Sequence, residues 1–357
     1  MTQLINPIEN FEFSKDAIAE AAQNDRLLSM EIEFSLRCNF RCAYCYAPHE
    51  NYFKDELTVV EIQSAILQAK AIGAEKIIIL GGEPSIYPHT PELIRFIHAL
   101  GLQTEIFTNG TGITSEFAGQ LHAHNTRVVL KMNSFNPALQ DLLSGYAGAY
   151  GIIQKALGNL KQAGYPSQNH FLAVSSIICR QNIAELPRMW QWLREQGIAP
   201  YFEIMTPQAN ALQNHWLHVD PLELETLFER IRKLDRRLFG QVWESQPPLV
   251  GNACMRHQFS CLITSKGDVM PCVGIPLAMG NIRRQPLREI LAGSPIRKDL
   301  KNYRHTIKGP CRTCEKASEC YGCRGAAFQL TGDYLASDPL CWRNARQAPP
   351  CDRPDGR

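Results

Sequence analysis

The sequence predicts an α/β fold built on a parallel sheet. Short apolar runs typical of strands alternate with segments that carry apolar residues at helical spacing, and several of these helical segments are followed at once by glycine. The alternation repeats six times between Glu31 and Gln208. Strands that alternate with helices form parallel sheets with right-handed crossovers. The pattern alone leaves an open doubly wound sheet and a barrel as alternatives.

One helix and the strand after it show how the elements are assigned. The segment at 58–72 places apolar residues on one helical face, and Gly73 follows its last turn. The strand at 76–80 is continuously apolar, as a strand buried on both faces should be. By the same criteria we expect strands at 31–36, 103–107, 127–134, 171–179 and 201–206, and helices at 91–100, 115–124, 149–163 and 183–196.

Other segments lie outside the six units. A polar helix capped by Ser14 is expected at 14–24, and a charged amphipathic helix at 221–239. The run Gln246-Pro247-Pro248 breaks regular structure before a cysteine-rich region. We therefore expect a lead-in over 1–30, a main domain over 31–208, a bridge over 209–250, a cysteine-rich domain over 251–345 and a tail over 346–357.

Composition excludes several classes of protein. The chain has 357 residues and a net charge of +2, which gives no bias toward nucleic acids or acidic membranes. It contains neither a long apolar run nor an export signal, so we expect no membrane partner and a cytoplasmic location. In such a chain, 13 cysteines indicate metal binding rather than disulfides.

Three cysteines follow the first predicted strand. Cys38, Cys42 and Cys45 are separated by three and then two residues. A four-iron cluster normally takes four thiolates, so three thiolates leave one iron open to a substrate or cofactor. A zinc site that borrows a distant fourth ligand is the alternative.

A second motif, Gly81-Gly82-Glu83-Pro84, follows the second strand, and an aromatic residue precedes the last cysteine of the first motif. In these two motifs the sequence resembles the radical S-adenosylmethionine (SAM) superfamily. The resemblance implies a partial (β/α)6 TIM barrel. It also implies a [4Fe–4S] cluster whose open iron chelates SAM and cleaves it to a 5′-deoxyadenosyl radical that abstracts hydrogen from a substrate.

In such folds the chemistry lies at the carboxyl ends of the strands. The resemblance places the SAM amino group at the end of the second strand, the ribose and carboxylate at the end of the fourth, and the adenine near the end of the sixth. The run Thr108-Asn109-Gly110 ends the third strand, with a simple turn as the alternative. The expected SAM-binding residues are Tyr44, Gly81, Gly82, Glu83, Thr108, Asn109, Asn133 and Ser134.

Three charged residues interrupt otherwise apolar strands: Glu33, Lys131 and Glu203. A charge buried without a partner is strongly destabilising. These residues therefore either face the barrel interior and act on substrate or SAM, or pair with one another as structural ion pairs. We predict that Lys131 and Glu203 are catalytic.

The C-terminal part holds a second set of cysteines, around a hairpin predicted at Lys266-Gly267-Asp268. Two zinc ions would also account for eight cysteines. The spacing resembles the SPASM extension of radical SAM enzymes, although two residues separate Cys320 from Cys323 where SPASM domains usually have three. The resemblance, which in all covers about residues 30–345, assigns Cys254, Cys261, Cys272 and Cys323 to a first auxiliary [4Fe–4S] cluster and Cys311, Cys314, Cys320 and Cys341 to a second.

Two cysteines remain outside these sets. Cys179 ends the fifth strand and is either a small core residue or a thiol that faces the barrel interior. Cys351 lies in the charged, proline-rich tail and is expected to bind no metal.

The resemblance implies a radical SAM/SPASM oxidoreductase with three [4Fe–4S] clusters, SAM, and a reductant such as flavodoxin or ferredoxin. With both auxiliary sets complete, those clusters are expected to carry electrons rather than bind substrate. A peptide or protein side chain is the favoured substrate, although the lead-in is too short for the leader-binding domain common in peptide-modifying members. A sugar, porphyrin or nucleoside is the alternative substrate, and an iron–sulfur electron-transfer or scaffold protein the alternative class.

Overall fold

The computed structural model describes residues 12–47 and 53–347, and the predicted α/β fold class is confirmed. Nine strands of the described chain form one sheet, in the order β6-β5-β4-β3-β2-β1-β7-β8-β9. Strands β1 to β6 pair in parallel and in chain order. Their bounds are β1 Ser29–Glu33, β2 Lys76–Leu80, β3 Gln103–Thr108, β4 Arg127–Lys131, β5 Leu172–Ile178 and β6 Ala199–Ile204.

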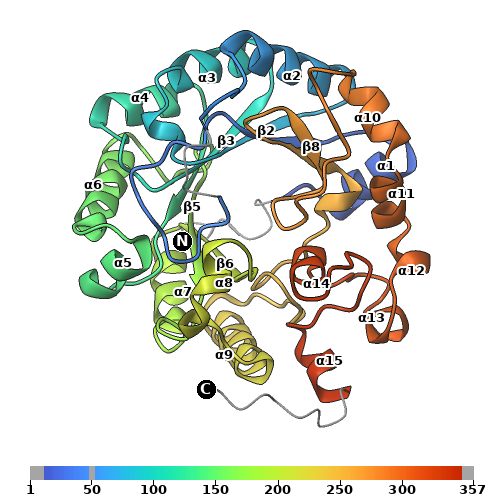
Figure 1. The fold of residues 1–357 in the computed structure, drawn as a ribbon. Coiled ribbons are helices and arrows are strands. Elements are labelled where there is room, and N and C mark those ends of the chain that lie inside the picture. Colours follow the sequence, from blue (N-terminus) through green and yellow to red (C-terminus); the bar gives the residue numbers. More distant parts are fainter. Residues whose placement is uncertain (1–11, 48–52, 348–357) are drawn as a thin grey trace.

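Helices cover the outer face of this sheet. In Figure 1, α2, α3, α4 and α6 form an arc outside the strands, and α7 packs against both β6 and α9. Outward residues such as Ile32, Ile79 and Leu130 pack in the main hydrophobic core beneath the helices. The bounds are α2 Val59–Ala71, α3 Thr90–Ala99, α4 Ser115–Ala123, α6 Ala149–Gln162, α7 Leu186–Glu195 and α9 Pro221–Phe239.

Strands β1 and β4 end three residues earlier than predicted because polar groups draw the backbone out of the sheet, and β6 and β5 end two residues and one residue early. β1 stops at Glu33, and the Leu36 amide donates to the Glu56 carboxylate at 2.8 Å. β4 stops at Lys131, and the Asn133 amide donates to the Gln140 side chain at 2.7 Å. These carboxyl ends are therefore loops. The strand predictions at 31–36 and 127–134 were wrong at their C-terminal ends, and β1 and β6 also begin two residues before their predicted starts.

Helix α5 (Pro137–Ser144) was missed by the sequence analysis, although its end signals are present. The Asn136 side chain caps it by accepting from the Leu139 amide, and Gly145 ends it in the left-handed conformation. The last carbonyls of α5 bind the cysteine loop that follows β1, so this short helix positions the site described below.

The C-terminal region extends the same sheet. β7 (Ser260–Ile263) pairs in parallel with β1, and β8 (Asp268–Met270) and β9 (Gly280–Asn281) follow antiparallel. The predicted hairpin at Lys266–Asp268 is confirmed, with Gly267 at φ 85°. The remaining helices are α1 Lys15–Gln23, capped by Ser14 as predicted, and α8 Asn210–Gln213, α10 Leu287–Gly293, α11 Pro295–Lys301, α12 Tyr303–Thr306, α13 Pro310–Thr313, α14 Arg324–Thr331 and α15 Trp342–Gln347.

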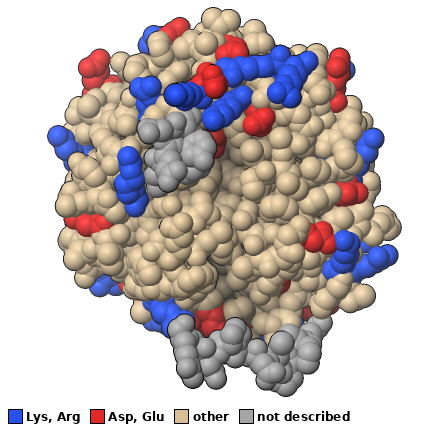
Figure 2. Space-filling view, in the orientation of Figure 1, with Lys and Arg blue, Asp and Glu red and all other residues tan. Residues whose placement is uncertain are grey.

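Charged side chains do not dominate the face seen in Figure 2. Uncharged residues cover most of that face, and basic and acidic side chains lie mainly toward its margin. Within the described residues, the structure contains no helix with the length and apolar character needed to span a bilayer.

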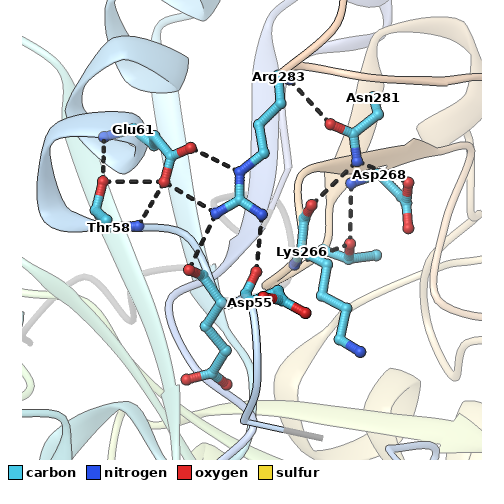
Figure 3. A network of polar contacts seen from close by, with 9 residues as sticks. Asp55, Thr58, Glu61, Lys266, Asp268, Asn281 and Arg283 are labelled. Carbon is cyan, nitrogen blue, oxygen red and sulfur yellow. Dashed lines mark hydrogen bonds and ion pairs between the residues drawn. The ribbon is translucent and has the colours of Figure 1, made fainter.

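Arg283 links the C-terminal hairpin to the start of α2 (Figure 3). Its guanidinium donates to the Glu61 carboxylate at 2.6 and 3.0 Å, and to the carbonyls of Asp55 and Glu56 at 2.8 and 3.1 Å. Hydrogen bonding from Arg283, with help from Thr58, lowers the pKa of Glu61 to about 2. The contact therefore joins the segment that follows β9 to the start of α2.

We predict that Arg283→Gln lowers the apparent Tm by about 2 °C, as expected for the loss of about 1 kcal/mol from a partly exposed ionic contact. Differential scanning fluorimetry of the cluster-loaded protein measures the change. The matched control is Arg284→Gln, since Arg284 is exposed and its side chain makes no hydrogen bond or ion pair with the described residues. Equal Tm values for the two variants would contradict the role given to Arg283.

Candidate functional site

A cavity of about 270 Å³ lies on the inner face of the sheet. Its wall is built from the carboxyl ends of the parallel strands on one side and from the C-terminal region on the other. Most of the predicted site residues line it, as parallel strands would place them. These are Cys38, Cys42, Tyr44, Cys45, Gly81, Gly82, Glu83, Thr108, Asn109, Lys131, Glu203, Cys254, Cys272 and Cys323.

The loop that carries Cys38, Cys42 and Cys45 is fixed by backbone hydrogen bonds to α5. The Arg41 amide donates to the Ser144 carbonyl, and the Ala43 amide to the Leu143 carbonyl, each at 3.0 Å. Because the loop is hydrogen bonded at Arg41 and at Ala43, its three thiols face the cavity in a defined arrangement.

Helix α8 holds the same loop from the other side, and the sequence analysis missed it. The Asn210 side chain donates to the Cys42 carbonyl and the Asn214 side chain to the Ala43 carbonyl, each at 3.0 Å. The signal was a pair of asparagines one helical turn apart just after the last parallel strand.

Burial shapes the chemistry of the three thiols. Desolvation raises the pKa of Cys38 to about 11 and that of Cys42 to about 12, and it also raises the pKa of Cys45. A buried thiolate is costly without a nearby positive charge, and a bound metal centre supplies that charge when it displaces the proton. A metal centre bound at these thiols would therefore have to displace their protons.

The two glycines after β2 allow its end to touch the cysteine loop. A Cβ at Gly81 would lie 2.3 Å from the Ser35 carbonyl oxygen, and one at Gly82 would lie 2.1 Å from that of Arg37. The Gly82 amide donates to the Ser35 carbonyl at 2.8 Å, and the Glu83 amide to the Arg37 carbonyl at 2.7 Å. Only glycine permits this approach of two backbones.

Glu83 uses its carboxylate to organise the neighbouring strand end. It is buried and accepts hydrogen bonds from the Thr108 hydroxyl, the Asn109 amide and the Ser85 amide. Burial raises its pKa, and these donors act in the opposite direction. Thr108 and Asn109 are thus held by Glu83, and both also accept turn hydrogen bonds from Gly110 and Thr111 and line the cavity.

Asn133 and Ser134 lie behind the wall of the cavity rather than in it. Asn133 donates to the Tyr44 hydroxyl at 2.7 Å and accepts from the Ile177 amide at 2.9 Å. Ser134 donates to Glu185. Both side chains are fully buried, so in this structure they position neighbouring loops, and their contact with SAM stays a prediction.

Lys131 and Glu203 pair with one another and also line the cavity, and their action on substrate or SAM stays a prediction. Their charged groups are 3.6 Å apart, and Lys131 also donates to the Ser175 hydroxyl at 2.8 Å. Both are partly exposed and line the cavity. They therefore neutralise one another while remaining available to a molecule in the cavity.

Glu31 and Arg256 form a second charged pair in the cavity wall, which the sequence analysis missed. Glu33, by contrast, does not line the cavity. It accepts from the Tyr46 hydroxyl at 3.0 Å and the Ser265 amide at 3.1 Å, and burial raises its pKa. Glu33 therefore has a structural role here, and it joins β1 to the loop after β7.

The cysteines predicted for the first auxiliary cluster are divided by the structure. Cys254, Cys272 and Cys323 line the cavity that the three N-terminal thiols share. Cys323 caps α14, and its sulfur accepts from the Ala326 amide at 3.3 Å. Cys261 lies elsewhere, on β7, buried in the main hydrophobic core.

The second predicted set is surrounded by N–H donors aimed at sulfur. The amides of Gly322, Lys316 and Asp338 donate to Cys320, Cys314 and Cys311 at 3.2, 3.5 and 3.4 Å. Burial raises the pKa of Cys320 to about 11 and that of Cys341, the fourth member, to about 12. Hydrogen bonds of this kind stabilise thiolate ligands of iron–sulfur clusters.

Two cysteines were assigned to none of these sets. Cys179 is fully buried in a small apolar cluster with Leu143, Ile177 and Met205, which favours its interpretation as a core residue. Cys351 lies outside the described residues.

Comparison with known proteins gives the family. The family model described as "Radical SAM superfamily" matches residues 32–193, and one described as "Iron-sulfur cluster-binding domain", the SPASM domain, matches residues 254–315. A PqqA peptide cyclase from Streptomyces rochei is 30% identical, with 87% of this chain and 88% of that protein covered. The chain belongs to the radical SAM superfamily.

Other relatives agree with this assignment. An AdoMet-dependent heme synthase from Methanosarcina barkeri (strain Fusaro / DSM 804) is 26% identical, with 88% of this chain and 96% of that protein covered. The structure of Streptococcus suis SuiB bound to precursor peptide SuiA has a TM-score of 0.68 at 16% identity, covering 92% of this chain and 79% of that one. The structure of anSMEcpe with bound AdoMet has the same TM-score at 15% identity, covering 90% and 95%. These structures share the fold.

The donor sets of this radical SAM enzyme fit the cofactors of its family. The three thiols of Cys38, Cys42 and Cys45 are half-buried on one loop and line one cavity, which suits a [4Fe–4S] cluster with one open iron. The strand end at Gly81 and Gly82 lies against that loop and lines the same cavity, where SAM would meet exposed backbone groups.

We predict that Gly82→Ala lowers the rate of SAM cleavage at least tenfold. The new methyl group would meet backbone atoms of Leu36 and Arg37 and push the cysteine loop away from β2, at a cost of about 1–3 kcal/mol. Chromatography of 5′-deoxyadenosine formed under anaerobic reduction measures the rate.

The control for this variant is Gly119→Ala in α4, where a Cβ meets no atom within 4 Å. Alanine favours a helix over glycine, so this change should keep full activity. Wild-type cleavage by Gly82→Ala would show that the close approach of the two backbones is not needed for SAM binding.

Proposed function

We propose that this chain is a SAM-dependent oxidoreductase that removes hydrogen from a peptide or protein side chain. The supporting observation is the single cavity lined both by Cys38, Cys42 and Cys45 and by cysteines of the SPASM domain. Cys38, Cys42 and Cys45 would hold the [4Fe–4S] cluster that supplies the electron for SAM cleavage, and the C-terminal cysteines would hold two auxiliary clusters that accept the electron the substrate loses. A flavodoxin or ferredoxin would provide the first electron.

The peptide substrate is supported by relatives of two kinds. The Streptomyces rochei relative is named as a peptide cyclase, and it aligns with most of this chain at 30% identity. SuiB, which shares the fold, has been solved with its precursor peptide. The mainly uncharged face in Figure 2 would also suit a peptide better than a polyanion.

A porphyrin precursor of heme is the second candidate. It is favoured by the Methanosarcina barkeri heme synthase, which aligns over 96% of its length. Two arginines, Arg256 and Arg324, line the cavity and are suited to bind the carboxylates that such a substrate carries.

Lys131 and Glu203 are the proposed catalytic residues. Their charged groups form an ion pair, and their place in the wall would let either one orient a polar group of the substrate. Lys131 also lies 5.5 Å from the centre of the Phe107 ring, so its ammonium is held between an anion, a hydroxyl and an aromatic face.

The function is tested by deuterium transfer. Anaerobically reduced protein is incubated with SAM and a candidate peptide or porphyrin deuterated at the reacting carbon, and 5′-deoxyadenosine is analysed by mass spectrometry. We predict deuterium in 5′-deoxyadenosine and a matching change in substrate mass, both abolished by Cys38→Ala, Cys42→Ala or Cys45→Ala. Cys179→Ala, a core change outside the cluster loop, should retain the activity.

Retention of SAM cleavage by any of the three loop variants would overturn the enzyme assignment. Deuterium transfer from the porphyrin alone would replace the peptide proposal with the second candidate.

We predict that Lys131→Met lowers product formation at least tenfold while SAM cleavage continues. The change removes a charge that faces the cavity and leaves Glu203 without its cation, but it keeps the cluster thiols in place. Product and 5′-deoxyadenosine are measured in the same reaction. If the double variant Lys131→Met/Glu203→Gln restores normal product yield, the pair is structural and neither residue is catalytic.

A further inference from the structure

The three cysteines of the first auxiliary set that line the cavity are held together by backbone packing. Beyond Cys272, Gly274 meets Gly325, the second residue after Cys323, so closely that a Cβ on Gly274 would lie 2.7 Å from the Gly325 Cα. The hydroxyl of Tyr321 lies 3.9 Å from the Cys254 sulfur. Segments distant in sequence therefore converge on one place in the cavity wall.

The register of β7 keeps Cys261 out of the cavity wall that the other three cysteines line. In the parallel pairing with β1, Cys261 lies beside Met30, and Leu262 lies beside Glu31. Glu31 lines the cavity, whereas Met30 belongs to the core on the outer face. Because side chains alternate along a strand, Cys261 faces outward with Met30 and has no exposed surface. Turning it inward would require a one-residue slip that inverts every side chain of β7.

Arg324 brings a positive charge to the part of the cavity wall that holds Cys254, Cys272 and Cys323. It is 1% exposed and lines the cavity. One of its terminal nitrogens donates to the carbonyls of Tyr334 and Ala336, whereas its Nε and second terminal nitrogen have no hydrogen-bond partner in the described structure. Arg324 lies beside the buried Asp338 carboxylate and the Cys323 thiol, and its remaining N–H groups leave donors for a further anionic group next to Cys323.

We propose that Cys254, Cys272 and Cys323 alone hold the first auxiliary cluster, and that its fourth iron takes an anionic donor group of the substrate. The proposal rests on the proposed function, since it places the substrate between the two clusters. It also changes the role expected from the sequence, because a cluster with an open iron can position the substrate as well as accept its electron. Cys261 is then a core residue.

The ligand set is tested by iron content in the variant Cys38→Ala/Cys42→Ala/Cys45→Ala, which lacks the SAM-binding cluster and cannot cleave SAM. After anaerobic reconstitution, two remaining four-iron clusters correspond to about eight irons. Adding Cys261→Ala or Cys261→Val should keep about eight irons, whereas the matched control Cys272→Ala should leave about four. A folded Cys261 variant with about four irons would overturn the three-thiolate assignment.

The open iron is tested with ¹³C-cyanide as the anionic probe, in the same background with Cys261 unchanged. After reduction, electron–nuclear double resonance should show ¹³C coupling to an auxiliary cluster, and Cys272→Ala should abolish it. The proposal is overturned if no ¹³C coupling is found. It is also overturned if protein grown with ¹⁵N-histidine shows a coupling lost in His257→Ala, since buried His257 lines the cavity and would then be the fourth ligand.

Neither measurement depends on turnover. A failure to find a substrate therefore leaves the ligand assignment standing, and a Cys261 ligand would leave the proposed function standing.

Discussion

The parallel pairing of β7 with β1 is the constraint on which the functional site depends. β1 leads directly into the loop of Cys38, Cys42 and Cys45, and β7 lies between Cys254 and Cys272 in the chain. Joining the two strands places both sets of thiols around one cavity. Glu33 and Arg283 reinforce this junction through hydrogen bonds across it. Cys254 and Cys272, which flank β7 in the chain, therefore line the site, whereas Cys261 on β7 itself faces the core.

Buried charge organises the inner face of that sheet. Glu31 pairs with Arg256, and Lys131 with Glu203, each pair joining different parts of the chain. Glu83 has no cation beside it in these contacts and is held instead by donors from Ser85, Thr108 and Asn109. A charge in the cavity wall without a partner would be strongly destabilising. Each of these charged groups is therefore stabilised by its ion pair or by its hydrogen-bond donors.

Sequence patterns predicted the repeated elements well and their ends poorly. Apolar periodicity reports burial, which a strand keeps along its whole length, and so the order and type of the six β/α units were correct. The ends depend on single side chains such as Glu56 and Gln140, which compete for backbone amides from 20 and 7 residues away. Helix α5 was missed for a similar reason, because its short length gives little periodicity although its caps are clear.

The sequence by itself determined the chemistry of this protein, because cysteine spacing and a Gly-Gly-Glu-Pro motif are local features that need no knowledge of distant contacts. Tertiary structure alone decided which cysteines meet. Cys261 and Cys272 look alike in the sequence, but strand register turns one toward the core, and backbone packing at Gly274 brings the other to the cavity. The face on which a strand residue lies is set by pairing with a strand more than 200 residues away in the chain, as Met30 with Cys261, and spacing carries no record of that pairing.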